Sequence, residues 1–122
     1  MLSRFAHIIC VIFAFLAGAA AAQPLQLVML ERDDCPWCQA WHREIGPGYP
    51  DSAEGQRAPL RRIDLAKPWP EDLPRLGAYY TPTFVLVACG SETGRLAGYP
   101  GEHFFYPALA QLLSQQPEGA SC

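Results

Sequence analysis

Two cysteines separated by two residues, Cys35 and Cys38, are the residues of this sequence whose types and spacing best support chemistry. They belong to a Cys-Pro-Trp-Cys motif at the expected start of a helix, where free N–H groups and the helix dipole favour a thiolate. We therefore expect Cys35 to attack a substrate disulfide and Cys38 to resolve the mixed disulfide. Pro36 is suited to the first helical turn, and Trp37 is expected to project outward as an apolar contact surface.

A lone C-x-x-C pair also allows a structural disulfide, part of a zinc site, or a copper site. Zinc needs four ligands, and no second C-x-x-C or closely spaced histidine pair supplies them. Haem attachment needs a histidine directly after the second cysteine, where this chain has Gln39. The position between a strand and a helix favours redox chemistry, and we expect neither a metal nor a cofactor.

The segments on either side of the motif are expected to hold it between a strand and a helix. Residues 25–30 are a short apolar run, which predicts a buried strand. Asp33 or Asp34 can cap the next helix, which we expect over residues 35–45, ending at the Gly-Pro-Gly of residues 46–48.

The rest of the chain continues this alternation of strands and helices. We expect strands over residues 60–65, 83–88 and 94–97 and helices over residues 71–79 and 102–116. This order predicts an α/β fold in which a mixed four-stranded sheet is flanked by helices on both faces.

Residues 1–22 are expected to be a cleaved signal peptide, which leaves residues 23–122 as one small domain. A short region with Arg4 precedes an apolar run over residues 8–16, and Ala20–Ala22 offers a cleavage site. An uncleaved anchor is the alternative. We expect the domain to be exported to the periplasm.

Composition and cysteine count narrow the class of protein further. Half of the residues are hydrophobic, and the net charge of −3 argues against nucleic acid as a partner, since nucleic-acid binders carry basic surfaces.

Cys89 follows the strand over residues 83–88, and the last helix should run toward the same end of the domain. We therefore predict a structural disulfide between Cys89 and Cys122, with two unpaired thiols as the alternative.

Three segments resemble the thioredoxin superfamily: residues 25–31, the motif at residues 35–38, and Thr-Pro-Thr-Phe-Val at residues 81–85. The resemblance implies a minimal thioredoxin-like fold over the whole mature chain. It makes Pro82 the cis-proline that packs beside the active-site disulfide. It also implies that the backbone of Thr81 is free to pair with an extended substrate segment.

Gly-Tyr-Pro-Gly at residues 98–101 and the pair Phe104-Phe105 resemble the small periplasmic thioredoxins linked to sulfur-oxidation (Sox) systems. In the family, the glycine matching Gly98 keeps the substrate groove open. This likeness implies a monomer that reduces exported proteins with disulfides or reactive cysteines. It also implies a membrane thiol-transfer protein as the electron donor.

One position departs from the family pattern. Thioredoxins carry a buried aspartate on the strand before the motif, and the matching residue here is Met29. Glu31, Asp33 and Asp34 are expected to be exposed, and their charge should oppose a thiolate at Cys35. His42 is expected to be a surface or packing residue rather than a base.

The residues leave three functions open. The first is a reductase of exported proteins, and the second is a thiol oxidase with the same residues. Oxidases of this fold usually carry an inserted helical domain, for which only the turn-rich residues 49–58 are available, so the reductase is favoured. The third is a chaperone that holds Cu(I) through Cys35 and Cys38.

Overall fold

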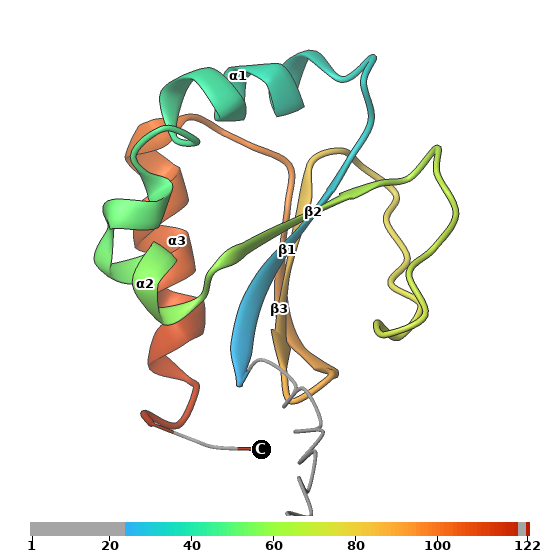
Figure 1. Ribbon diagram of the computed structural model, residues 1–122. Helices are drawn as coiled ribbons and strands as arrows, with labels where there is room; N and C mark the ends of the chain where they lie inside the picture. The colour runs from blue at the N-terminus through green and yellow to red at the C-terminus, as the bar shows by residue number, and fades with distance from the viewer. Residues whose placement is uncertain (1–23, 120–121) are drawn as a thin grey trace, which may run out of the picture.

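The computed structural model describes residues 24–119 and 122 of the chain (Figure 1). Its elements are β1 (Leu25–Glu31), α1 (Pro36–Glu44), the 3-10 helix η1 (Tyr49–Asp51), α2 (Ala53–Arg57), β2 (Leu60–Asp64), β3 (Thr83–Ala88), β4 (Ser91–Ala97) and α3 (Glu102–Ser114). The expected signal peptide, residues 1–22, lies outside the described residues. Over the described range, no helix is long and apolar enough to cross a membrane.

The four strands form one sheet in the order β2-β1-β3-β4. β1 runs parallel to β2 and antiparallel to β3, so that Val28 has Arg61 on one side and Val85 on the other. β4 pairs with β3 in antiparallel fashion. The parallel pair is joined through α1 and α2, because parallel strands need a long crossover connection. The mixed four-stranded sheet expected from the sequence is thus confirmed.

One face of the sheet packs against α1 and α3, with α1 across the top of the sheet in Figure 1 and α2 beside α3. The centre of this core is aromatic: the ring of Phe105 on α3 lies 5.0 Å from Phe84 on β3 and 5.7 Å from Trp41 on α1, both edge to face. Such pairs add to the stabilisation that burial alone provides. α1 and α3 are therefore joined to the sheet through a shared aromatic cluster.

The opposite face of the sheet is covered by residues 65–82, which form no helix. The helix predicted over residues 71–79 is wrong, and helices consequently cover one face of the sheet only. Pro68, Pro70 and Pro74 cannot donate backbone hydrogen bonds, and each disfavours the helical conformation in the residue before it. The segment instead packs its leucines against the sheet; the buried residues of this face are Val28, Leu30, Ile63, Leu73, Leu76, Val85 and Val87.

Two arginines of the sheet fasten this irregular segment. The guanidinium of Arg61 donates two hydrogen bonds to the carboxylate of Asp72, at 2.6 and 2.8 Å. Arg95 on β4 donates to the carbonyl oxygen of Gly77 at 2.7 Å. The segment therefore reaches Pro82 along a fixed course, although it has no regular structure of its own.

The connection between α1 and β2 is more ordered than its turn-rich sequence indicated. Tyr49 is fully buried, and its hydroxyl donates to the carbonyl oxygen of Ala58 at 2.7 Å. Ser52 caps α2 by accepting the N–H of Gly55 at 2.9 Å. Gly55 lies so close to the backbone of Tyr49 that a Cβ atom there would be 1.8 Å from its carbonyl oxygen. The short helices therefore depend on the smallest side chain at this position.

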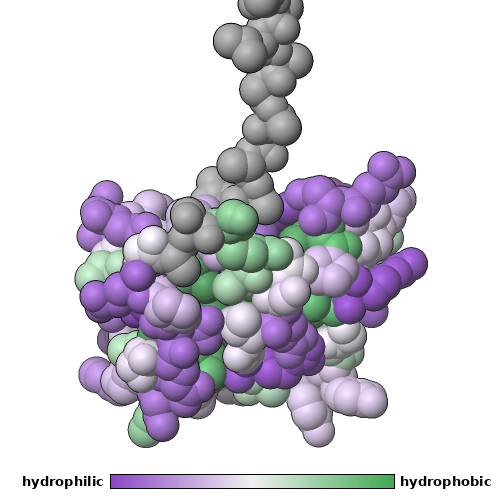
Figure 2. Space-filling model, turned by 90° about the horizontal axis from the view of Figure 1, so that it is seen from below, coloured by the Kyte–Doolittle hydropathy of each residue, from purple (hydrophilic) through white to green (hydrophobic). Residues whose placement is uncertain are grey.

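Cys89 and Cys122 are joined in a disulfide, with their Cα atoms 5.5 Å apart. Cys89 and Gly90 form the turn between β3 and β4, and both have positive φ angles, as expected in a tight hairpin. This turn lies at the end of the sheet away from α1 (Figure 1). Figure 2 views the molecule from that end, where hydrophilic residues surround smaller hydrophobic areas.

Candidate active site

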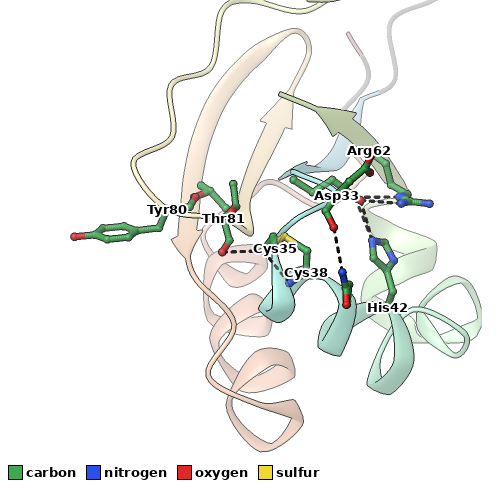
Figure 3. Close-up of a disulfide and its surroundings, with 10 residues drawn as sticks. Asp33, Cys35, Cys38, His42, Arg62, Tyr80 and Thr81 are labelled. Carbon is green, nitrogen blue, oxygen red and sulfur yellow. Dashed lines mark hydrogen bonds and ion pairs between the residues drawn. A yellow bond between two sulfur atoms is a disulfide. The ribbon is translucent and has the colours of Figure 1, made fainter. Parts of the chain in front are cut away.

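Cys35 and Cys38 are joined in a disulfide at the N-terminus of α1. Cys35 itself is the N-cap residue, and its sulfur accepts the N–H of Cys38 at 3.0 Å. The sequence had offered Asp33 or Asp34 for this role, but the carbonyl oxygen of Asp33 instead accepts from the side chain of Gln39 at 3.1 Å (Figure 3). A backbone N–H directed at the sulfur would favour the thiolate once the disulfide is reduced.

The two cysteines differ in their access to water. Cys35 keeps 5% of its surface exposed, whereas Cys38 keeps only 1%. Both belong to the same buried cluster as Trp41. A thiol-reactive partner therefore meets the sulfur of Cys35 first.

Thr81 and Pro82 bring the start of β3 against the disulfide. The carbonyl oxygen of Thr81 lies 3.2 Å from the Cys35 sulfur (Figure 3), and the Thr81–Pro82 peptide bond is cis. Thr83 fixes the approach to β3 by donating its hydroxyl hydrogen to the carbonyl oxygen of Tyr80 at 2.6 Å. The structure thus places together two segments, 46 residues apart, that the sequence had linked only by resemblance.

Gly98 lies beside this loop. Its N–H donates to the carbonyl oxygen of Pro82 at 2.7 Å, and its φ angle of +83° favours glycine. A Cβ atom at Gly98 would meet nothing within 4 Å, so the glycine serves the backbone conformation. The next residue, Tyr99, is buried and donates its hydroxyl hydrogen to Glu44 at 2.5 Å, which connects this turn to the end of α1.

Exposed aromatic side chains accompany the disulfide. Trp37, between the two cysteines, is 63% exposed. Tyr79 and Tyr80 directly precede Thr81, and they are 100% and 70% exposed. Figure 3 shows Tyr80 projecting outward from the site. Sequence reasoning selected Trp37 but missed the two tyrosines, although two consecutive aromatic residues before Thr-Pro were a signal that could have found them.

Glu31 is buried, with 7% of its surface exposed, so the expectation that it is exposed is wrong. It ends β1, where the guanidinium of Arg62 on β2 donates to its two carboxylate oxygens at 2.7 and 3.0 Å. The Nε2 atom of His42 on α1 lies 3.1 and 3.2 Å from the same oxygens (Figure 3). Burial raises the pKa of Glu31, but hydrogen bonds and charges from Arg62 and His42 outweigh it and hold the pKa below its ordinary value. Met29, at the position of the family's aspartate, is fully buried.

Among the residues that the structure describes, no three or more His, Cys, Asp or Glu side chains are grouped so that they could hold a metal ion.

No family model and no curated protein sequence matches the chain. A solved structure does: the periplasmic thioredoxin SoxS from Paracoccus pantotrophus in its reduced form. It is 47% identical, with a TM-score of 0.70, over 75% of this chain and 97% of that chain. The thioredoxin Mala s 13 from Malassezia sympodialis is 15% identical, with a TM-score of 0.49, over 75% of this chain and 76% of that chain.

The fold, the C-x-x-C disulfide at a helix N-terminus and the likeness to SoxS define a thiol:disulfide oxidoreductase. The chain belongs to the thioredoxin family.

Proposed function

We propose that this thioredoxin is exported to the periplasm and reduces disulfides in partner proteins there. The printed name of its 47% identical relative, a periplasmic thioredoxin, supports the compartment, as does the signal-peptide pattern of residues 1–22. Within the described residues, only the short helices η1 and α2 lie between α1 and β2. The oxidases of this fold usually carry an inserted helical domain, so this connection supports reduction of substrates rather than oxidation.

The observation that carries the proposal is the asymmetry between the two cysteines. Cys35 caps the helix and is the more exposed, so its thiolate attacks the substrate disulfide and one substrate sulfur leaves. Cys38 then attacks the Cys35 sulfur of the mixed disulfide and releases the second substrate sulfur. The substrate gains two electrons, and Cys35 and Cys38 are left as a disulfide.

Substrate binding falls to the surface around Cys35. An extended peptide would pair with the backbone of Thr81 and pass between Trp37 and the turn at Gly98. Pro82 contributes no N–H of its own, and its carbonyl is already occupied by Gly98, which leaves Thr81 to make the contact. We propose a monomer whose disulfide is re-reduced by a membrane thiol-transfer protein.

Trapping of partners tests this proposal. A Cys38→Ser protein attacks the substrate disulfide but cannot release the substrate from the mixed disulfide. It should therefore accumulate covalent adducts in the exported fraction, and dithiothreitol should cleave them. A Cys35→Ser protein should form few or none. Mass spectrometry of the adducts identifies the partners. Equal trapping by both variants, or none by either, would contradict the proposal.

A matched control uses the other disulfide. A Cys89→Ser/Cys122→Ser double variant should turn over like the wild-type protein and trap nothing, because that disulfide lies at the far end of the sheet.

The direction of the reaction is tested by the reduction potential of the Cys35–Cys38 pair. A value near about −270 mV fits a reductase, whereas one near about −120 mV fits an oxidase. Stoichiometric copper in anaerobically purified protein would instead indicate a chaperone.

A further inference from the structure

The cluster formed by buried Glu31, half-buried His42 and exposed Arg62 has no part in the mechanism given above, although His42 follows the second cysteine by one turn of α1. We propose that His42, held in place by Glu31, accepts the proton of Cys38 when Cys38 resolves the mixed disulfide. This inference rests on the proposed function, because it assigns a residue to its second step. Arg62 and Glu31 act as positioning residues.

Cys38 needs such a base because its surroundings do not favour a thiolate. It is 1% exposed, and loss of water disfavours the charged form of a thiol. The sulfur of Cys35 accepts a backbone N–H, whereas no hydrogen bond to the sulfur of Cys38 is present among residues 24–119. The helix N-terminus therefore prepares the attacking cysteine, while the resolving cysteine must lose its proton to another group.

His42 is the titratable side chain placed to take that proton. It follows Cys38 by four residues on α1, so the two side chains lie on one face of the helix with Cβ atoms about 6 Å apart. A helical side chain leans toward the preceding turn, which here is the turn that holds Cys38. A direct hydrogen bond or one bridging water would span a gap of that size, which is the reach that general bases use. His42 itself is partly buried, with 28% of its side chain exposed.

The contact with Glu31 determines which ring nitrogen is available. The carboxylate lies 3.1 Å from Nε2 of His42, and an ionised carboxylate only accepts hydrogen bonds. The hydrogen of the neutral ring therefore lies on Nε2, and Nδ1, the nitrogen nearer the helix backbone, carries the free lone pair. When Nδ1 takes a proton, the resulting imidazolium keeps its bond to the carboxylate.

Arg62 explains why the proton goes to the histidine and not to the buried acid. Its two hydrogen bonds keep Glu31 ionised, as the lowered pKa of Glu31 indicates. The charged groups facing His42 are thus Glu31 from β1 and Arg62 from β2, while Asp33 acts on Arg62 from the loop before α1. Trp41 lies edge-on to the ring at 5.3 Å and brings no charge.

The proposed step is balanced. The Cys38 thiol gives its proton to Nδ1 of His42, and its sulfur attacks the Cys35 sulfur. The bond between Cys35 and the substrate breaks, and the electron pair leaves with the substrate sulfur. The imidazolium can then return the proton to that thiolate or to water. Over both steps the two protein thiols are oxidised to a disulfide, and the substrate disulfide is reduced to two thiols.

Single-turnover kinetics separate the two steps. The reduced protein is mixed rapidly with an aromatic disulfide that releases one coloured thiolate on attack and a second on resolution. Cys38→Ser should show the first release only, which assigns the phases. His42→Ala should slow the second release by about a hundredfold or more and leave the first within twofold. Added imidazole should restore part of the second rate, an effect that loss of a structural contact would not show.

A change at Glu31 provides an independent readout of the second phase. Glu31→Gln should slow this phase and leave the first phase within twofold, since the imidazolium formed in the step loses its charged partner. His103→Gln, a change at an exposed histidine of α3, should alter neither phase.

The outcomes distinguish this inference from the proposed function. Two results with His42→Ala would overturn the role of His42. One is a second phase as fast as that of the wild-type protein, and the other is an equal slowing of both phases that added imidazole does not reverse. Neither result would contradict the proposed reductase function. Failure of the wild-type protein to give two releases would overturn the proposed function itself.

Discussion

The disulfide between Cys89 and Cys122 joins the β3–β4 turn to the last residue of the chain across 33 positions of sequence. A covalent link of this span restricts the unfolded chain and stabilises the fold by about 3–4 kcal/mol in the chain-entropy description. We therefore expect Cys122→Ser to lower the free energy of unfolding by that amount, as measured by urea denaturation of the oxidised protein. Disulfide reductase activity at low denaturant should not change.

The same experiment in excess dithiothreitol is the control. With all disulfides reduced, Cys122→Ser and the wild-type protein should unfold at the same urea concentration. Equal midpoints under oxidising conditions would mean that the bond between Cys89 and Cys122 contributes nothing to stability.

Two adjacent phenylalanines of α3 should respond differently to truncation. Phe105 is 1% exposed and contacts the rings of Phe84 and Trp41, so Phe105→Ala should destabilise the protein by about 3–5 kcal/mol. Phe104 is 64% exposed, so Phe104→Ala should cost less than about 1 kcal/mol. Thermal and urea unfolding of the two variants measure the difference, and similar losses would contradict the packing described for α3.

Gly55 and Gly77 provide a second matched pair. Alanine normally strengthens a helix, but a Cβ atom at Gly55 would lie 1.8 Å from the carbonyl oxygen of Tyr49. Gly55→Ala should therefore destabilise the protein by at least about 1–3 kcal/mol. Gly77→Ala meets nothing within 4 Å and should be neutral or slightly stabilising. A stabilised Gly55→Ala protein in urea denaturation would rule out the close approach of α2 to Tyr49.

Glu31 should make stability depend on acid pH. Its pKa in the folded protein lies below the ordinary value of 4.5, so its contribution is present above that value and is lost as pH falls through the folded pKa. Between pH 7 and pH 3, wild-type stability measured by urea unfolding should approach that of Glu31→Gln as the pH falls. Glu71→Gln, at an exposed position, should follow the wild-type curve throughout. A constant gap between the wild-type and Glu31→Gln curves would show that Glu31 does not titrate in this way.

The local features of the fold were predictable because they depend on neighbouring residues. The apolar run of residues 25–30 becomes the buried strand β1, and the Gly-Pro-Gly at residues 46–48 ends the helix that starts after Cys35. Strand β3 is buried along most of its length, as its β-branched and apolar residues indicated. Both a buried strand and the end of a helix at glycine or proline can be recognised from a few consecutive residues.

The features that escaped prediction depend on residues distant in sequence. Glu31 is acidic and close to two exposed aspartates, and only the pairing of β1 with β2 brings Arg62 to it. The segment before β3 shows spaced leucines like those of a helix, yet Leu73 and Leu76 reach the sheet from an irregular backbone fastened by Arg61 and Arg95. Tertiary contacts decide such cases, and a single sequence does not display them.

Strand β1 is made first but lies between β2 and β3, where Leu25 pairs with Ala88. While the chain is being synthesised, this antiparallel partner is still to come, and closing so long a loop slows folding. Until β3 has formed, the helix that begins after Cys35 lacks the sheet residues it packs against, and Thr81 does not yet lie beside the two cysteines. Their reactivity is therefore acquired only when the second half of the chain joins the first.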